Sequence, residues 1–130
     1  MKEFLPKNDL EIALLKAKSG FLPASELLRS FVDAKVVVPS AAEVAKDGAG
    51  FQPLQFSKEN VQMLACFTTP ERIGEFLTMA PFYLEITGMQ LLQRLPPDYG
   101  VVINPGWPVG FDISPQGIPK ILADFKENVG

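Results

Sequence analysis

The sequence contains few of the side chains that enzymes most often use to transfer protons, attack carbonyl groups or bind metals. It has no histidine and a single cysteine, Cys66. Within one chain these counts exclude a disulfide framework, a zinc site built on cysteine and histidine, and a relay of the Cys-His or Ser-His-Asp type. We therefore assign no catalytic residue, and we expect neither a metal nor another cofactor.

Cys66 itself has the sequence context of an inert thiol. It lies inside a run of apolar residues with no basic neighbour, whereas a reactive cysteine needs electropositive and partly exposed surroundings. The segment Gly48-Ala49-Gly50 is not expected to bind phosphate, because it lacks the Gly-Lys-Ser/Thr ending of a phosphate-binding loop. We expect a buried thiol and a flexible loop.

Two carboxylates, Glu85 and Asp112, occur in segments that otherwise alternate between apolar and polar residues. A closed sheet could bring them together as an acid and base pair acting on a substrate near Tyr83 or Tyr99. The plainer interpretation is that each faces solvent from the polar side of its own strand. A small carboxylate-dependent enzyme that needs no metal is therefore the alternative hypothesis.

A proline-rich loop near the end of the chain is the candidate binding site. Its Asn-Pro-Gly sequence is typical of a type II turn, whose third position requires a positive φ. Trp107 follows directly and is stiffened by its neighbours, as are the aromatic anchors of interfaces and ligand pockets. The alternative is that the indole packs over Phe111 and closes the core. The candidate residues are Asn104, Pro105, Gly106, Trp107 and Pro108.

Composition limits the partners. Twelve Lys and Arg against fifteen Asp and Glu give a net charge of −3, and the cations are scattered singly, so we expect no nucleic acid partner. The N-terminus has no signal-like apolar region and no apolar run is long enough to span a bilayer, so we expect a cytoplasmic protein without a membrane contact. A hydrophobic content of 47% indicates an apolar surface patch, and hence a protein partner or a homo-oligomer such as a dimer.

The elements that would position these residues are short. The spacing of apolar residues and the capping signals, including the boxes Asn8 to Glu11 and Thr87 to Gln90, predict helices. They are expected at about 9–18, from 23 onwards, at 70–78, at 87–95 and from 114 to 125.

Alternating or β-branched runs predict the strands, and one of them is apolar on both faces and therefore central. Its hairpin partner is expected to precede it across a four-residue connection, 57–60. The strands are expected at 35–39, 51–56, 61–67, 82–86, 101–103 and 109–113.

The resulting order, ααβββαβαββα, predicts an α+β fold with a single mixed sheet of about five or six strands and helices packed against it. A length of 130 residues is sufficient for one core without covalent crosslinks. We expect one domain over residues 1–130 and no second domain.

The segments 101–106 (Val-Val-Ile-Asn-Pro-Gly) and 109–115 (Val-Gly-Phe-Asp-Ile-Ser-Pro) resemble the C-terminal signature of the SseB N-terminal domain family, the enhanced serine sensitivity proteins. Segments 10–14, 36–39 and 67–72 are similar to the same family in the same order. The resemblance implies an α+β domain of a cytoplasmic bacterial protein and contributes no catalytic residues. Trp107 and Pro108 depart from it, since small or polar residues would be expected there.

Together these features favour a non-enzymatic protein-binding or ligand-binding module. Longer members of the family continue into a second domain, so a third hypothesis is an accessory fragment that acts with a separately encoded partner.

Overall fold

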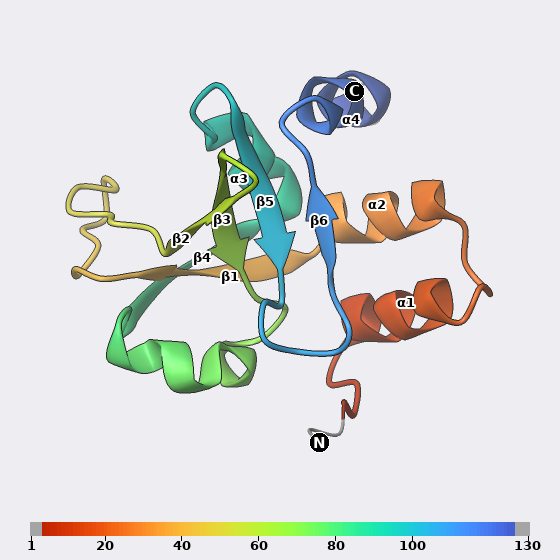
Figure 1. Ribbon diagram of the computed structural model, residues 1–130, viewed down its shortest axis with the longest axis horizontal. Coiled ribbons are helices and arrows are strands. Elements are labelled where there is room, and N and C mark those ends of the chain that lie inside the picture. Colours follow the sequence, from red (N-terminus) through yellow and green to blue (C-terminus); the bar gives the residue numbers. More distant parts are fainter. Residues whose placement is uncertain (1–3, 127–130) are drawn as a thin grey trace.

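The computed structural model describes residues 4–126 (Figure 1). The predicted order of elements is confirmed, except that the third helical segment is a 3-10 helix, η1. The elements are α1 (Asp9–Lys18), α2 (Ala24–Asp33), β1 (Lys35–Ser40), β2 (Gln55–Lys58), β3 (Val61–Cys66), η1 (Pro70–Thr78), β4 (Phe82–Thr87), α3 (Gly88–Arg94), β5 (Tyr99–Ile103), β6 (Phe111–Ile113) and α4 (Gly117–Lys126).

The strands form two sheets, so the α+β class is confirmed but the expectation of a single sheet is wrong. A four-stranded sheet has the order β2-β3-β5-β6, with β3 and β5 parallel and the outer pairs antiparallel. β1 and β4 pair separately as an antiparallel ribbon. Two isolated bridges, Val37 to Phe67 and Ser40 to Pro53, join the sheets. Pro53 belongs to the second bridge and Pro39 precedes it, and neither residue has an N–H to donate to a ladder there.

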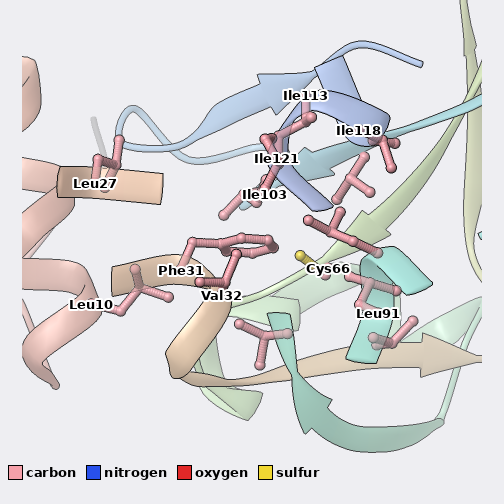
Figure 2. Packing of buried hydrophobic residues seen from close by; sticks show 14 of the residues in the cluster. Leu10, Leu27, Phe31, Val32, Cys66, Leu91, Ile103, Ile113, Ile118 and Ile121 are labelled. Atoms are coloured by element: carbon pink, nitrogen blue, oxygen red, sulfur yellow. The ribbon is translucent and has the colours of Figure 1, made fainter. Parts of the chain in front are cut away.

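Helices cover one face of the strands and η1 covers the other. The larger core lies against α1, α2, α3 and α4, and Figure 2 shows Phe31 of α2 near the middle of its labelled residues. The smaller core, with Phe67 and Ile73, lies on the η1 side. β3 contributes Leu64 to the larger core and Ala65 to the smaller one, which confirms that it is a central strand with two apolar faces.

The hairpin between β2 and β3 is confirmed, but its connection has two residues rather than four. Glu59 and Asn60 both have positive φ, 51° and 68°, as a type I′ turn requires. The right-handed twist of that turn suits the strands, so Ser57 and Lys58 stay paired. β2 therefore extends to Lys58, beyond the predicted end at residue 56, and it begins at Gln55 rather than at residue 51.

η1 has the predicted bounds, but it contains Gly74 at φ 54° and ψ −128°, which interrupts regular helical hydrogen bonding. The starts of two later elements differ from expectation. β6 begins at Phe111 rather than 109, and α4 begins at Gly117, after a Ser114 turn that closes with a bond from the Gly117 N–H to the Ser114 carbonyl at 3.0 Å. Within residues 4–126 no helix is long and apolar enough to cross a bilayer.

Candidate functional site

A buried ion pair joins α1 to η1. The guanidinium of Arg72 donates from Nε to Glu11 Oε2 at 2.9 Å and from Nη2 to Glu11 Oε1 at 2.8 Å. The two side chains are only 4% and 0% exposed. A planar, two-point contact of this kind is the strongest geometry available to an Arg and a carboxylate.

Further donors complete the coordination of Glu11. The Thr68 hydroxyl donates to Oε2, and the Lys7 N–H donates to Oε1 at 2.8 Å. Burial alone would raise the pKa of Glu11, but the hydrogen bonds from Arg72, Thr68 and Lys7, together with the charge of Arg72, hold that pKa below its ordinary value. The carboxylate is therefore ionised inside the fold.

The predicted capping box at α1 is half correct. Asn8 accepts a hydrogen bond from the Glu11 N–H at 2.9 Å, as an N-cap should. The Glu11 carboxylate does not return the contact to Asn8, because Arg72 and Thr68 draw it into the interior. The Glu11 N–H thus makes the predicted N-cap bond, while the Glu11 carboxylate accepts from Lys7, Thr68 and Arg72 instead of from Asn8.

Asn104 extends this arrangement to the loop after β5. Its Oδ1 accepts the Thr68 N–H at 3.0 Å, its Nδ2 donates to Thr68 Oγ1 at 3.0 Å, and its backbone adopts φ 57°. Asn8 Nδ2 donates to the Thr68 carbonyl at 3.0 Å. We call Asn8, Glu11, Thr68, Arg72 and Asn104 the buried polar cluster. It fixes α1, the 68–72 segment and the 104–108 loop to one another.

Trp107 is held on the outer side of this cluster. The predicted turn is present, with Gly106 at φ 86° and the Trp107 N–H bonded to the Asn104 carbonyl at 3.2 Å. The indole Nε1 donates to the Arg72 carbonyl at 2.7 Å, and the Arg72 guanidinium carbon lies 4.6 Å from the indole centroid and 4.0 Å from that of Phe4. The indole ring thus packs against the Arg72 guanidinium in a cation–π contact, and this contact and the hydrogen bond hold the loop in place.

The alternative interpretation placed the indole over Phe111, but the ring pairs formed by these two residues involve other partners. Trp107 meets Phe4 edge to face at 6.0 Å, and Phe111 meets Phe31 at 5.6 Å. The five candidate residues from Asn104 to Pro108 line a shallow recess of about 420 Å³. Asn104 turns inward, leaving the other four at the surface or half-buried. Binding at these residues stays a prediction.

A better enclosed cavity, which we did not foresee, lies beneath the loop of residues 45–51. It has a volume of about 360 Å³, and we call it the loop pocket. Its walls come from β3, β4, α3 and the loop itself. The lining residues are Ala45, Lys46, Asp47, Gly48, Phe51, Leu64, Leu84, Ile86, Leu91, Arg94 and Leu95.

The loop over this pocket, which includes Gly48-Ala49-Gly50, has backbone hydrogen bonds at its base and at its tip. At its base the buried Ser40 hydroxyl accepts the Gln52 N–H at 3.0 Å, and the Ala41 N–H bonds to the Gln52 carbonyl at 2.8 Å. At its tip the Ala45 N–H bonds to the Ala49 carbonyl at 2.9 Å. The alternation of Leu84 and Ile86 was the available sequence signal, since it sets both on the pocket side of β4.

Comparison with protein families gives one match, to the SseB protein N-terminal domain, over residues 10–120. The chain belongs to this family. Neither the curated proteins nor the solved structures contain a match. The matched range includes the loop pocket and every member of the buried polar cluster except Asn8.

The two carboxylates proposed as a catalytic pair are not brought together in this SseB domain. Glu85 lies in β4 of the two-stranded sheet, whereas Asp112 lies in β6, at the edge of the other sheet, and is ion-paired with Lys58. Tyr99 donates to Gln55 at 3.2 Å, and Tyr83 is 46% exposed. Among residues 4–126 no three His, Cys, Asp or Glu side chains are placed to hold a metal ion.

Cys66 is buried, as expected. Burial raises the pKa of its thiol well above the usual value, so the native protein should react with a thiol reagent such as DTNB on the order of a hundredfold more slowly than the urea-unfolded chain. The rate of absorbance change checks this, with a Cys66→Ala variant as the blank. Comparable rates in the folded and unfolded states would contradict it.

Proposed function

We propose that this SseB domain acts in the bacterial cytoplasm as a non-enzymatic binding module, and that the loop pocket holds its small-molecule ligand. The observation that carries the proposal is the partly enclosed, mainly apolar cavity between α3, β4 and the 45–51 loop. Its volume of about 360 Å³ lies in the range of small-molecule sites.

The walls of the loop pocket belong to the larger core. Leu64, Ile86 and Leu91 are between 3% and 9% exposed and pack in that core, yet each also lines the cavity. An apolar ligand would extend the core outward and remove further apolar surface from water. The site therefore has an intrinsic driving force for apolar groups.

The covering loop has hydrogen bonds of its own that would hold it in place over the pocket. The Ser40 hydroxyl holds its base and the turn from Ala45 to Ala49 holds its tip. A preformed site avoids the entropy cost of ordering a loop upon binding. This supports a binding role for the 45–51 segment in addition to its role as a connection.

Octan-1-ol tests the proposal, because it is neutral and its chain fits the cavity. Saturable binding should shift the amide resonances of residues 45–51 and 91–95, and at a hundred times Kd it should add about 2.7 kcal/mol to the free energy of unfolding. Leu84→Trp should fill the pocket and abolish binding. Tyr83→Trp, at the neighbouring exposed position on the opposite face of β4, is the matched control. Absence of saturable binding by any eight-carbon probe would refute the proposal.

A second candidate function is self-association through β4. Among the described strands β4 pairs only with β1, and its Phe82 and Tyr83 are 41% and 46% exposed. An antiparallel two-fold pairing centred on Leu84 would set Glu85 opposite Tyr83 of the second copy, which avoids opposing like charges. Sedimentation velocity should then show a concentration-dependent dimer, and a monomer at all concentrations would contradict this candidate.

A further inference from the structure

Two cations line the otherwise apolar loop pocket. Lys46 comes from the covering loop and Arg94 from the last turn of α3, and both side chains are exposed at the solvent side. Neither takes part in the ion pairs formed among residues 4–126. Their charges are therefore available to a ligand.

Asp47 is the one carboxylate in the lining, and it already has a structural partner. Its Oδ1 accepts the Ala49 N–H at 2.9 Å, which holds the tip of the loop. The ionisable lining groups thus carry one negative and two positive charges. The excess of positive charge is local, because the whole chain has a net charge of −3.

The apolar and charged parts of the pocket are segregated. The carbon-rich walls come from Leu64, Leu84, Ile86 and Leu91, which are buried or half-buried, whereas the cations belong to the exposed part of the lining. A ligand that satisfies both must have an apolar body and a single anionic head.

We infer that the loop pocket binds a small amphipathic monoanion, with its carboxylate or similar head between Lys46 and Arg94 and a chain of about eight carbons against the leucine and isoleucine walls. This inference rests on the proposed function and adds the class of ligand. Each buried methylene strengthens binding about fourfold, so the chain supplies most of the affinity. The solvent-exposed cations supply selectivity, which we expect to be about fivefold.

Three probes share an eight-carbon alkyl chain and differ in the charge of the head group: octanoate, octan-1-ol and octylammonium. Titrating each by calorimetry at pH 7 separates the contribution of the apolar walls from that of the two cations. Octanoate should bind about fivefold more tightly than octan-1-ol, and octylammonium more weakly than either. Raising the salt from 0.1 to 0.5 M should narrow the gap between octanoate and octanol, because exposed charges are screened.

The variants Lys46→Gln and Arg94→Gln should each reduce the preference for octanoate and leave the affinity for octan-1-ol unchanged. Lys120→Gln, which removes an exposed cation from α4 outside the pocket lining, is the matched control and should keep the preference. Equal binding of octanoate and octanol would overturn the inference and leave the proposed function standing. Tightest binding of octylammonium would also overturn it, and failure of all three probes to bind would refute both proposals.

Discussion

Replacing Arg72 with methionine is expected to lower the free energy of unfolding by about 3 to 5 kcal/mol. The variant keeps most of the side-chain volume but leaves the Glu11 carboxylate, which is 0% exposed, without its cation. It also removes the charge that contacts the rings of both Phe4 and Trp107. Urea unfolding followed by fluorescence measures the loss directly, because Trp107 is the single tryptophan and reports on this site.

A nearby exposed ion pair provides the control. Lys7 and Glu71 are 3.9 Å apart with side chains about half exposed or more, and Glu71→Gln should cost less than about 1 kcal/mol. The double variant Glu11→Leu, Arg72→Met should recover much of the loss, since it leaves no buried charge unpaired. Equal stabilities of Arg72→Met and Glu71→Gln would contradict the prediction that the buried ion pair contributes more to folding than the exposed one.

The same ion pair predicts a dependence on pH. Because the folded state holds the pKa of Glu11 below its ordinary value, the unfolded chain takes up a proton first as the pH falls. The contribution of Glu11 is therefore complete above the ordinary pKa and is lost as the pH drops through the lowered one. The difference in stability between the wild type and Glu11→Gln should shrink over that interval.

Gly88→Ala is expected to have the second largest effect, a loss of about 3 kcal/mol or more. Gly88 opens α3, and its N–H bonds to the Ala34 carbonyl at 3.0 Å. A Cβ there would lie 2.1 Å from the Phe31 carbonyl oxygen and 2.8 Å from its carbon. Both are backbone atoms of α2, so the clash must separate two packed helices.

Gly117→Ala is a matched control because Gly117 also opens a helix, α4. A Cβ at that position would meet Ser114 Oγ at 3.5 Å and Ile113 Cγ2 at 3.7 Å, which are ordinary contacts. It should be neutral or stabilising by up to about 1 kcal/mol. Thermal unfolding of the two variants measures the difference. Similar melting temperatures would contradict the predicted clash between a Cβ at position 88 and the Phe31 backbone.

Local signals predicted most of the elements of this fold. Asn8 and the Thr87 to Gln90 capping box marked helix starts that are present, and the two apolar faces of 61–67 identified the central strand. Where prediction failed, the deciding interaction was distant or energetically unusual. A glutamate at φ 51° in a hairpin turn is uncommon, so the sequence pattern predicts a connection that is two residues too long.

The candidate sites were less predictable for the same reason. Glu11 and Arg72 are 61 positions apart in the sequence, and each has a plausible local role, as a capping acid and as a charge in a helix. Only the packing of α1 against the 68–72 segment makes them partners. The loop pocket likewise depends on how the 45–51 segment folds over α3 and β4, which no local pattern specifies.

The position of β1 determines whether the two cores can unfold separately. Val36 and Val38 belong to the larger core, while Val37 belongs to the smaller one and exchanges both backbone hydrogen bonds with Phe67. One strand is thus shared by both cores, and neither core can lose it without exposing the other to water. The two cores should melt as a single cooperative unit, with no stable half-folded form in which one of them survives.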